Sequence, residues 1–128
     1  MAPPRKHDTD RILDAARTIA LRDGPRATSV SAIARHSGAP AGTLYHRFGS
    51  RDGLLQAAWL RALGRFQAAA LEAADDPDPV EAGVAMAAAA VRFARTWPDD
   101  ARLIVVVRRH DLLDGGPDPA FEERLATV

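Results

Sequence analysis

Apolar residues recur along most of this chain at the three- and four-residue intervals of a helix that buries one face. The first such stretch is predicted over residues 9 or 10 to 22, with Asp8 or Thr9 as its N-cap. Gly24 and Pro25 follow in the order that commonly ends a helix. The apolar positions of this first helix are Ile12, Leu13, Ala16, Ile19 and Ala20.

Two short helices are predicted next, joined by a tight turn. Ser29 is the expected N-cap of the first, and Gly38 ends it. Pro40 suits the beginning of the second, at residues 41–48, and Gly49 closes it. The inner face of the first short helix consists of Val30, Ile33 and Ala34.

Longer helices are predicted for the rest of the chain, so the expected fold class is all-α. A linker rich in Asp and Pro at residues 75–79 and a turn at 115–119 separate them. A strand is the alternative at residues 103–107, which include three consecutive valines. The expected helices run from Arg51, capped by Ser50, to about Ala74, from 79 to 96, from a cap at Asp99 or Asp100 to about Leu113, and from 120 to 126.

The formal net charge of zero conceals an uneven distribution. Residues 1–65 hold 11 basic and 5 acidic side chains, whereas residues 66–128 hold 6 basic and 12 acidic ones. A basic half is typical of a surface that binds a polyanion, although chance clustering of solvated charges is the alternative. The charge pattern therefore favours a nucleic-acid partner for the first half of the chain.

Composition and motifs argue against several other classes of protein. The chain has no Cys, which excludes disulfides, a thiolate nucleophile and a Cys-based zinc site. No apolar run approaches the length of about 20 residues that a membrane-spanning helix needs. Catalytic and phosphate-loop motifs are lacking, His110-Asp111 is half a metal pair at most, and Asp75-Asp76-Asp78 lacks calcium-loop spacing. We therefore predict neither an enzyme nor a cofactor or metal site.

The spacing within residues 29–48 is that of a helix-turn-helix. Ala34 is small enough to let two helices cross closely, and Gly38 can adopt the left-handed conformation of a sharp turn. Leu44, six residues later, returns to the same small core. In a helix-turn-helix the second helix enters the DNA major groove. Any hairpin of two helices also needs a small residue and a Gly, so other roles stay open on spacing alone.

The residues that follow resemble the signature of TetR-family transcriptional regulators. This resemblance rests on the segment 42–48, on Ser50-Arg51-Asp52 and on Leu54-Leu55, and it covers residues 9–60. Residues 29–34 are similar to the second helix of that family. The resemblance implies a helix-turn-helix DNA-binding domain at residues 1–52, joined by a long fourth helix to a helical ligand-binding and dimerisation domain at 53–128.

Further expectations follow from this resemblance. It implies a cytoplasmic, nucleoid-associated homodimer that binds double-stranded palindromic operator DNA, most simply a repressor released by a small-molecule effector. The family's last two long helices have no counterpart in these 128 residues, so we expect the chain to be part of a longer protein. The alternative function is a helical protein-interaction module that uses its Arg-rich half against an acidic partner.

Candidate DNA contacts are assigned residue by residue. The family positions that match Tyr45 and Arg51 contact phosphate, while ring packing and an ion pair with Asp52 are their respective alternatives. Thr43 suits a phosphate or a thymine methyl group, and Ser29 suits both a helix cap and an anion site. The full predicted set is Thr28, Ser29, Ser31, Ala41, Gly42, Thr43, Tyr45, His46, Arg47 and Arg51.

Two further assignments concern the ends of the molecule. Arg5-Lys6-His7 is interpreted as a disordered basic tail, with a minor-groove arm as the alternative. By resemblance, aromatic and other large side chains of the second half are candidates for an effector pocket, with ordinary core packing as the alternative. These ligand-binding candidates are Trp59, Phe66, Met86, Phe93, Trp97 and His110.

Overall fold

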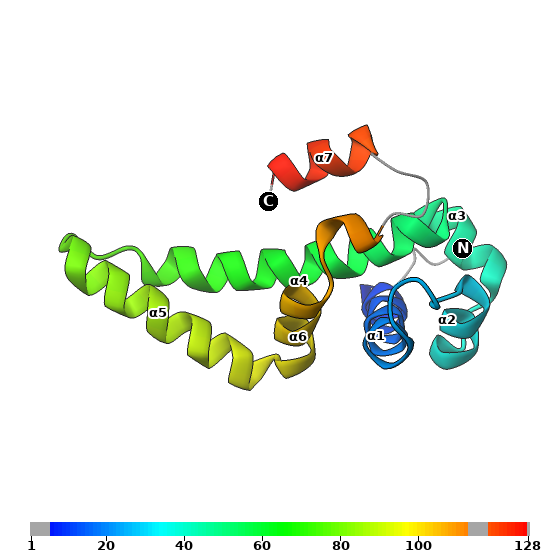
Figure 1. Ribbon diagram of the computed structural model, residues 1–128, viewed down its shortest axis with the longest axis horizontal. Coiled ribbons are helices and arrows are strands. Elements are labelled where there is room, and N and C mark those ends of the chain that lie inside the picture. Colours follow the sequence, from blue (N-terminus) through cyan, green and yellow to red (C-terminus); the bar gives the residue numbers. More distant parts are fainter. Residues whose placement is uncertain (1–5, 113–117, 128) are drawn as a thin grey trace.

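A computed structural model describes residues 6–112 and 118–127, and every regular element in these ranges is a helix (Figure 1). This confirms the all-α prediction. The elements are α1 (Lys6–Asp23), α2 (Val30–Ser37), α3 (Ala41–Phe48), α4 (Arg51–Ala73), α5 (Pro79–Thr96), α6 (Pro98–Val106), the short 3-10 helix η1 (Arg109–Leu112) and α7 (Pro119–Ala126).

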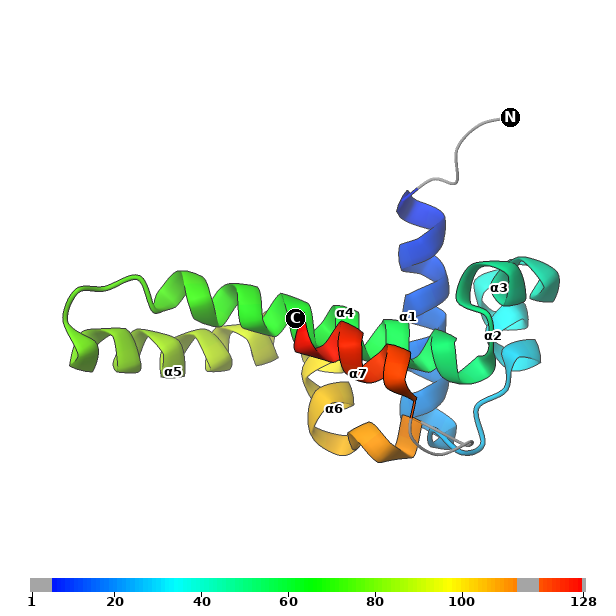
Figure 2. The same ribbon diagram turned by 90° about the horizontal axis from the view of Figure 1, so that it is seen from above.

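The long helix α4 connects the two halves of the molecule. The head, α1–α3, gathers around its beginning, while α5 runs back along its far half (Figure 1). The helix α6 lies between the head and α5, and it contacts α1, α4 and α5. Seen from above, α1 crosses α4, and α7 runs alongside it (Figure 2). Helices α4 and α6 are therefore both in direct contact with the head.

Apolar residues predicted on the helix faces form the core of the head. Ile12, Ile19, Ile33, Leu44 and Leu54 are all at most 2% exposed. Burial of a side chain of this size stabilises a fold by about 1.5–3 kcal/mol. The same buried cluster continues through Trp59 and Leu103 to Phe121, so the predicted boundary at residue 52 falls beside a shared core.

The turn between α2 and α3 is fixed by local and distant contacts. Gly38 has φ 73° and donates its backbone N–H to the Ala34 carbonyl at 2.9 Å. Arg11 of α1 donates from Nε and Nη2 to the Ser37 carbonyl at 2.9 and 2.7 Å. These bonds set the angle between α2 and α3.

Helix α7 is held against α4 by both polar and aromatic contacts. Gln56 is fully buried, donates to Asp118 at 3.2 Å and accepts from Arg124. Trp59 donates its indole N–H to the Val107 carbonyl at 3.1 Å and packs edge-on against Phe121, with 6.3 Å between ring centroids. The buried amide of Gln56 and the indole N–H of Trp59 therefore both have hydrogen-bond partners, as buried polar groups require.

Several predicted boundaries were wrong. Helix α1 begins at Lys6, which places Asp8 in its first turn rather than at its N-cap and puts the backbone of Lys6 and His7 in a helix rather than a disordered tail. Helix α6 begins at Pro98, lacks a side-chain cap and ends at Val106, which also overturns the strand alternative. Arg5, Leu113 and residues 115–117 lie outside the described residues. The other predicted helices agree with the structure to within a residue.

Candidate nucleic-acid interface

Helix α3 presents one face to solvent and packs the other against the core, through Leu44 and the partly buried Ala41 and Phe48. Leu44 is 1% exposed, and a helix turns by about 100° per residue. Gly42 and His46 therefore lie on the side opposite Leu44, with Thr43 and Tyr45 on either flank; all four are exposed. Ala41 and Arg47 are partly buried at the margins of this face. The exposed face is narrow, with a glycine at its centre.

A cleft of about 680 Å³ lies between the beginning of α1 and α3. Thr43, His46 and Arg47 line it on one side, and Asp8 and Arg11 line it on the other. The backbone from Ser37 to Pro40 also borders the cleft. The turn that shapes the head thus lies next to the exposed polar side chains of α3.

The beginning of α2 is capped as predicted. The Ser29 hydroxyl accepts a hydrogen bond from the Ala32 backbone N–H at 3.1 Å. The first backbone bond within the helix runs from the Ile33 N–H to the Ser29 carbonyl at 3.1 Å. The N–H groups of Val30 and Ser31 precede it, as at every helix beginning, and such groups attract anions. Ser29 and Ser31 are exposed beside them.

Thr28 does not have the exposure that the sequence led us to expect. Its side chain is 2% exposed, and its hydroxyl donates to the Gly24 carbonyl at 2.8 Å. The residue therefore closes the turn before α2 and is not available to a phosphate.

Arg51 is likewise held inside the head. Its guanidinium donates from Nε to the Thr28 carbonyl at 2.8 Å and from Nη2 to the Pro25 carbonyl. Nη1 pairs with Asp52 at 2.7 Å, which is the alternative given for this residue, and the side chain is 16% exposed. Arg51 therefore fixes the turn that presents Ser29, rather than extending toward solvent.

Two basic residues of the head were missed. Arg26, in the turn before Ser29, and Arg35, on α2, are exposed and form no ion pair or hydrogen bond with any described residue. Their only signal in the sequence was the general excess of arginine in the first half. They join Arg47 as the arginines of the head that are free to meet an anion.

The six ligand-binding candidates do not form one site. Phe93 and Trp97 line a groove of about 460 Å³ between α4 and α5, together with Arg65, Glu72 and Arg92. Phe66 stacks edge-on against Phe93, with 5.5 Å between ring centroids, but does not line the groove.

The other candidates lie apart from that groove. Trp59 is part of the core beneath α7, and Met86 is 40% exposed on α5. His110 is exposed on η1, with 3.4 Å between its Nε2 and Asp111. A pocket built from all six is therefore ruled out by their positions.

The described residues contain no helix long and apolar enough to cross a membrane. Nor do they contain a group of three or more His, Asp or Glu side chains placed to hold a metal ion.

Comparison with known proteins shows what the head is similar to. Residues 12–58 match the model for bacterial regulatory proteins of the tetR family. The transcriptional regulator UidR of Escherichia coli K12 is 44% identical over 61 residues, which is 44% of this chain and 31% of that protein. The head and the beginning of α4 are therefore similar to regulatory proteins of the tetR family. The chain spans about a third of the length of the curated relatives that it matches.

Solved structures extend the likeness to the remaining helices. PfmR, a TetR-family regulator from Thermus thermophilus, is 28% identical with a TM-score of 0.67, covering 90% of this chain and 64% of its own. The fatty acid degradation regulator FadR from Bacillus halodurans has the same fold, with a TM-score of 0.73 at 19% identity, covering 97% and 63%. The TetR fold thus accounts for the described helices on both sides of α4.

Proposed function

We propose that this chain is a sequence-specific DNA-binding transcriptional regulator whose α3 enters the major groove. The observation that carries the proposal is the exposed face of α3, formed by Gly42, Thr43, Tyr45 and His46 on the side away from the buried Leu44. A helix of this kind fits the width of the major groove. The match of residues 12–58 to the tetR family and the similarity to a named transcriptional regulator support the same function.

Each exposed residue has a role suited to its chemistry. Gly42 lets the backbone of α3 approach the base edges closely, and His46 donates a hydrogen bond from the centre of the same face. The Thr43 methyl group contacts a thymine, as does Ala41 from the margin, while the Tyr45 hydroxyl meets a phosphate. With so few base-reading groups, part of the sequence preference comes from DNA shape.

The remaining contacts hold the head on the backbone of the duplex. Ser29 and Ser31 place a phosphate at the beginning of α2, and Arg26, Arg35 and Arg47 supply the positive charge. Arg51 and Thr28 act only by holding the turn in place.

The biological setting follows from this activity. We propose that the protein is a homodimer that binds a palindromic operator in the nucleoid, in the cytoplasm. It acts there as a repressor, and binding of a small-molecule effector releases it from the operator. A two-fold symmetric protein matches a palindrome because each head reads one half-site.

Selection of bound duplexes from a random pool tests this function directly. We expect one enriched sequence with two half-sites, and an affinity that falls steeply with salt while the sequence preference persists. His46→Ala should weaken binding to the selected operator, whereas Arg102→Gln, an exposed change on α6, should not. No enriched sequence together with salt-independent binding would reject the regulator and favour a protein-interaction module.

A further inference from the structure

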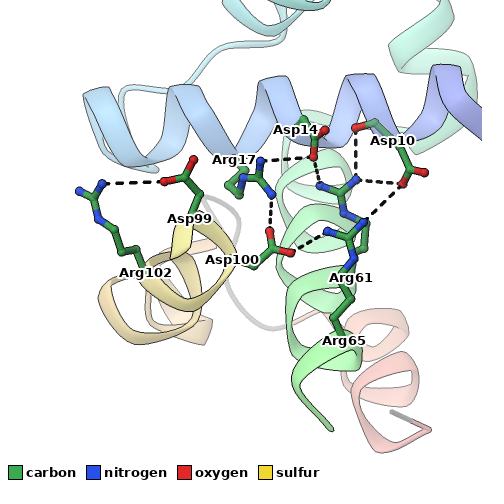
Figure 3. A network of polar contacts seen from close by, with 8 residues as sticks. All are labelled: Asp10, Asp14, Arg17, Arg61, Arg65, Asp99, Asp100 and Arg102. Carbon is green, nitrogen blue, oxygen red and sulfur yellow. Dashed lines mark hydrogen bonds and ion pairs between the residues drawn. The ribbon is translucent and has the colours of Figure 1, made fainter. Parts of the chain in front are cut away.

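Asp100 joins three helices at the boundary between the head and the rest of the molecule (Figure 3). Its carboxylate is completely buried in the first turn of α6. Oδ1 accepts from Arg17 of α1, and Oδ2 accepts from Arg65 of α4 at 2.7 Å. We call Arg17, Asp100 and Arg65 the Asp100 bridge. It connects the head to α4 and α6 through a single side chain.

A second layer of ion pairs surrounds this bridge. Arg61 of α4 pairs with Asp10 at 3.0 Å and with Asp14, both on α1, and Arg17 also lies 3.4 Å from Asp14 (Figure 3). The Nε atoms of Arg17 and Arg61 are buried and have no hydrogen-bond partner among the described residues. Buried donors without partners are costly. The junction is therefore polar and incompletely satisfied, unlike the apolar core on either side.

The buried carboxylate depends on both guanidinium groups. Burial raises the pKa of Asp100, but the hydrogen bonds and charges of Arg17 and Arg65 outweigh burial and hold the pKa below its ordinary value. A buried charge that loses one partner is strongly destabilised. Withdrawal of either arginine would therefore loosen α6 and α1 from each other.

Arg65 is the member of the bridge that faces the groove between α4 and α5. Its guanidinium carbon lies 4.4 Å from the centroid of the Trp97 ring, and its side chain lines the groove. The Arg65 side chain is 28% exposed, against 14% for Arg17. A molecule in the groove thus reaches the bridge through Arg65.

The end of the groove beside Trp97 is aromatic and positively charged. Trp97 is 44% exposed, Phe93 forms part of the lining, and Arg92 has no ion-pair partner among the described residues although it lines the same groove. The acidic Glu72 is seven residues beyond Arg65 on α4, about 10 Å further along the helix axis. Planar carboxylates bind guanidinium groups well, and flat rings stack on indole.

We propose that this groove binds a small organic anion with a flat apolar body, such as an aromatic carboxylate, and that the anion acts by drawing Arg65 away from Asp100. The carboxylate replaces Asp100 as the acceptor for Arg65, while the ring packs against Trp97 and Phe93. Asp100 then keeps only Arg17, and α1 loosens from α6. The inference rests on the proposed function for its consequence, which is weaker operator binding.

Naphthoate and its uncharged analogue naphthamide are suitable probes. We expect calorimetry on the whole chain to detect naphthoate binding and no comparable binding of naphthamide. Hydrogen exchange of α1 and α6 amides should increase when naphthoate is bound, and operator affinity should fall about tenfold. Arg92→Gln should weaken naphthoate binding, and the matched control Arg102→Gln, outside the groove, should not. Failure of naphthoate to bind, or equal binding of naphthamide, would overturn the proposal.

Variants of the bridge separate ligand binding from its effect. Asp100→Asn removes the charge that holds Arg65 in the bridge and leaves Asp10, at 3.9 Å, as its ion-pair partner, so naphthoate should bind at least as tightly but no longer change exchange in α1. If that variant does not fold, Arg65→Lys keeps the charge without the planar guanidinium and should weaken naphthoate binding. Naphthoate binding without increased α1 exchange in the wild type would refute the role of the bridge. If no DNA sequence binds while naphthoate still loosens α1, the proposed function fails and this inference stands.

Discussion

At the scale of single residues, we expect substitution by alanine to have opposite effects on stability at two glycines, one on α3 and one at the beginning of α4. A Cβ atom at Gly42 would meet nothing within 4 Å, whereas one at Gly53 would overlap the Phe48 carbonyl oxygen. Gly42→Ala should therefore stabilise the fold by about 0.5–1 kcal/mol through helix propensity. Gly53→Ala should destabilise it by about 1–3 kcal/mol because α4 must move away from the end of α3. Urea unfolding of the two variants checks this; equal shifts would contradict the described α3–α4 junction.

Tyr45 and Arg51 separate DNA contact from support of the head. Tyr45 is 54% exposed, so Tyr45→Phe should leave stability unchanged and weaken operator binding by about 1 kcal/mol, the value of one hydrogen bond. Arg51→Ala leaves the Thr28 and Pro25 carbonyls without their guanidinium donor and should lower the unfolding free energy by about 1–3 kcal/mol. Thermal unfolding alongside fluorescence anisotropy distinguishes them. A stability loss in Tyr45→Phe would show that the ring packs in the fold.

The exposure of Tyr45 and the internal position of Arg51 show which features of a site a sequence can predict. Tyr45, His46 and Thr43 were assigned from the family resemblance and their chemistry, and the helical period that buries Leu44 leaves all three exposed. Arg51 offered no such signal, because its acceptors lie 23 and 26 residues earlier in the chain. Thr28 was misassigned for a related reason, since only the folded turn brings its hydroxyl to the Gly24 carbonyl.

At the scale of helices, local signals fixed most boundaries. Ser29, Ser50 and Asp78 cap α2, α4 and α5 through side-chain bonds within three residues, so the sequence was sufficient there. The beginning of α6 was misplaced because Asp100 was interpreted as a cap. Its actual partners, Arg17 and Arg65, are 83 and 35 residues away. Contacts between residues so far apart produce no periodic pattern in the sequence, so they could not be predicted from it.

The attachment of α6 should respond to acid. Because the pKa of Asp100 is lower in the folded chain than its ordinary value of 3.8, its contribution to stability is complete above that value. The contribution is lost as the pH falls through the lower folded pKa. The stability difference between the wild type and Asp100→Asn should therefore be constant near neutral pH and shrink below about pH 4. Denaturant unfolding at several pH values measures it; a difference that stays constant in acid would contradict the bridge.

At the scale of the whole molecule, the structure changes the meaning of the basic first half. Half of its ten arginines are used internally: Arg11 on the Ser37 carbonyl, Arg51 on the turn before α2, and Arg17, Arg61 and Arg65 at the junction with α6. The excess of positive charge in the sequence therefore overstates what the head offers to DNA. Much of that charge neutralises buried or half-buried aspartates instead.

The salt dependence of DNA binding reports the number of free arginines. Each phosphate that a protein neutralises adds about 0.9 to the slope of log affinity against log salt. Arg26→Gln, Arg35→Gln and Arg47→Gln should each reduce that slope by about 0.9 per head. Arg11→Gln should lower stability and affinity but leave the slope unchanged, because its guanidinium already serves the Ser37 carbonyl. Titrations of operator DNA at several salt concentrations measure all four slopes. A reduced slope for Arg11→Gln, or unchanged slopes for the other three, would show that different cations meet the phosphates.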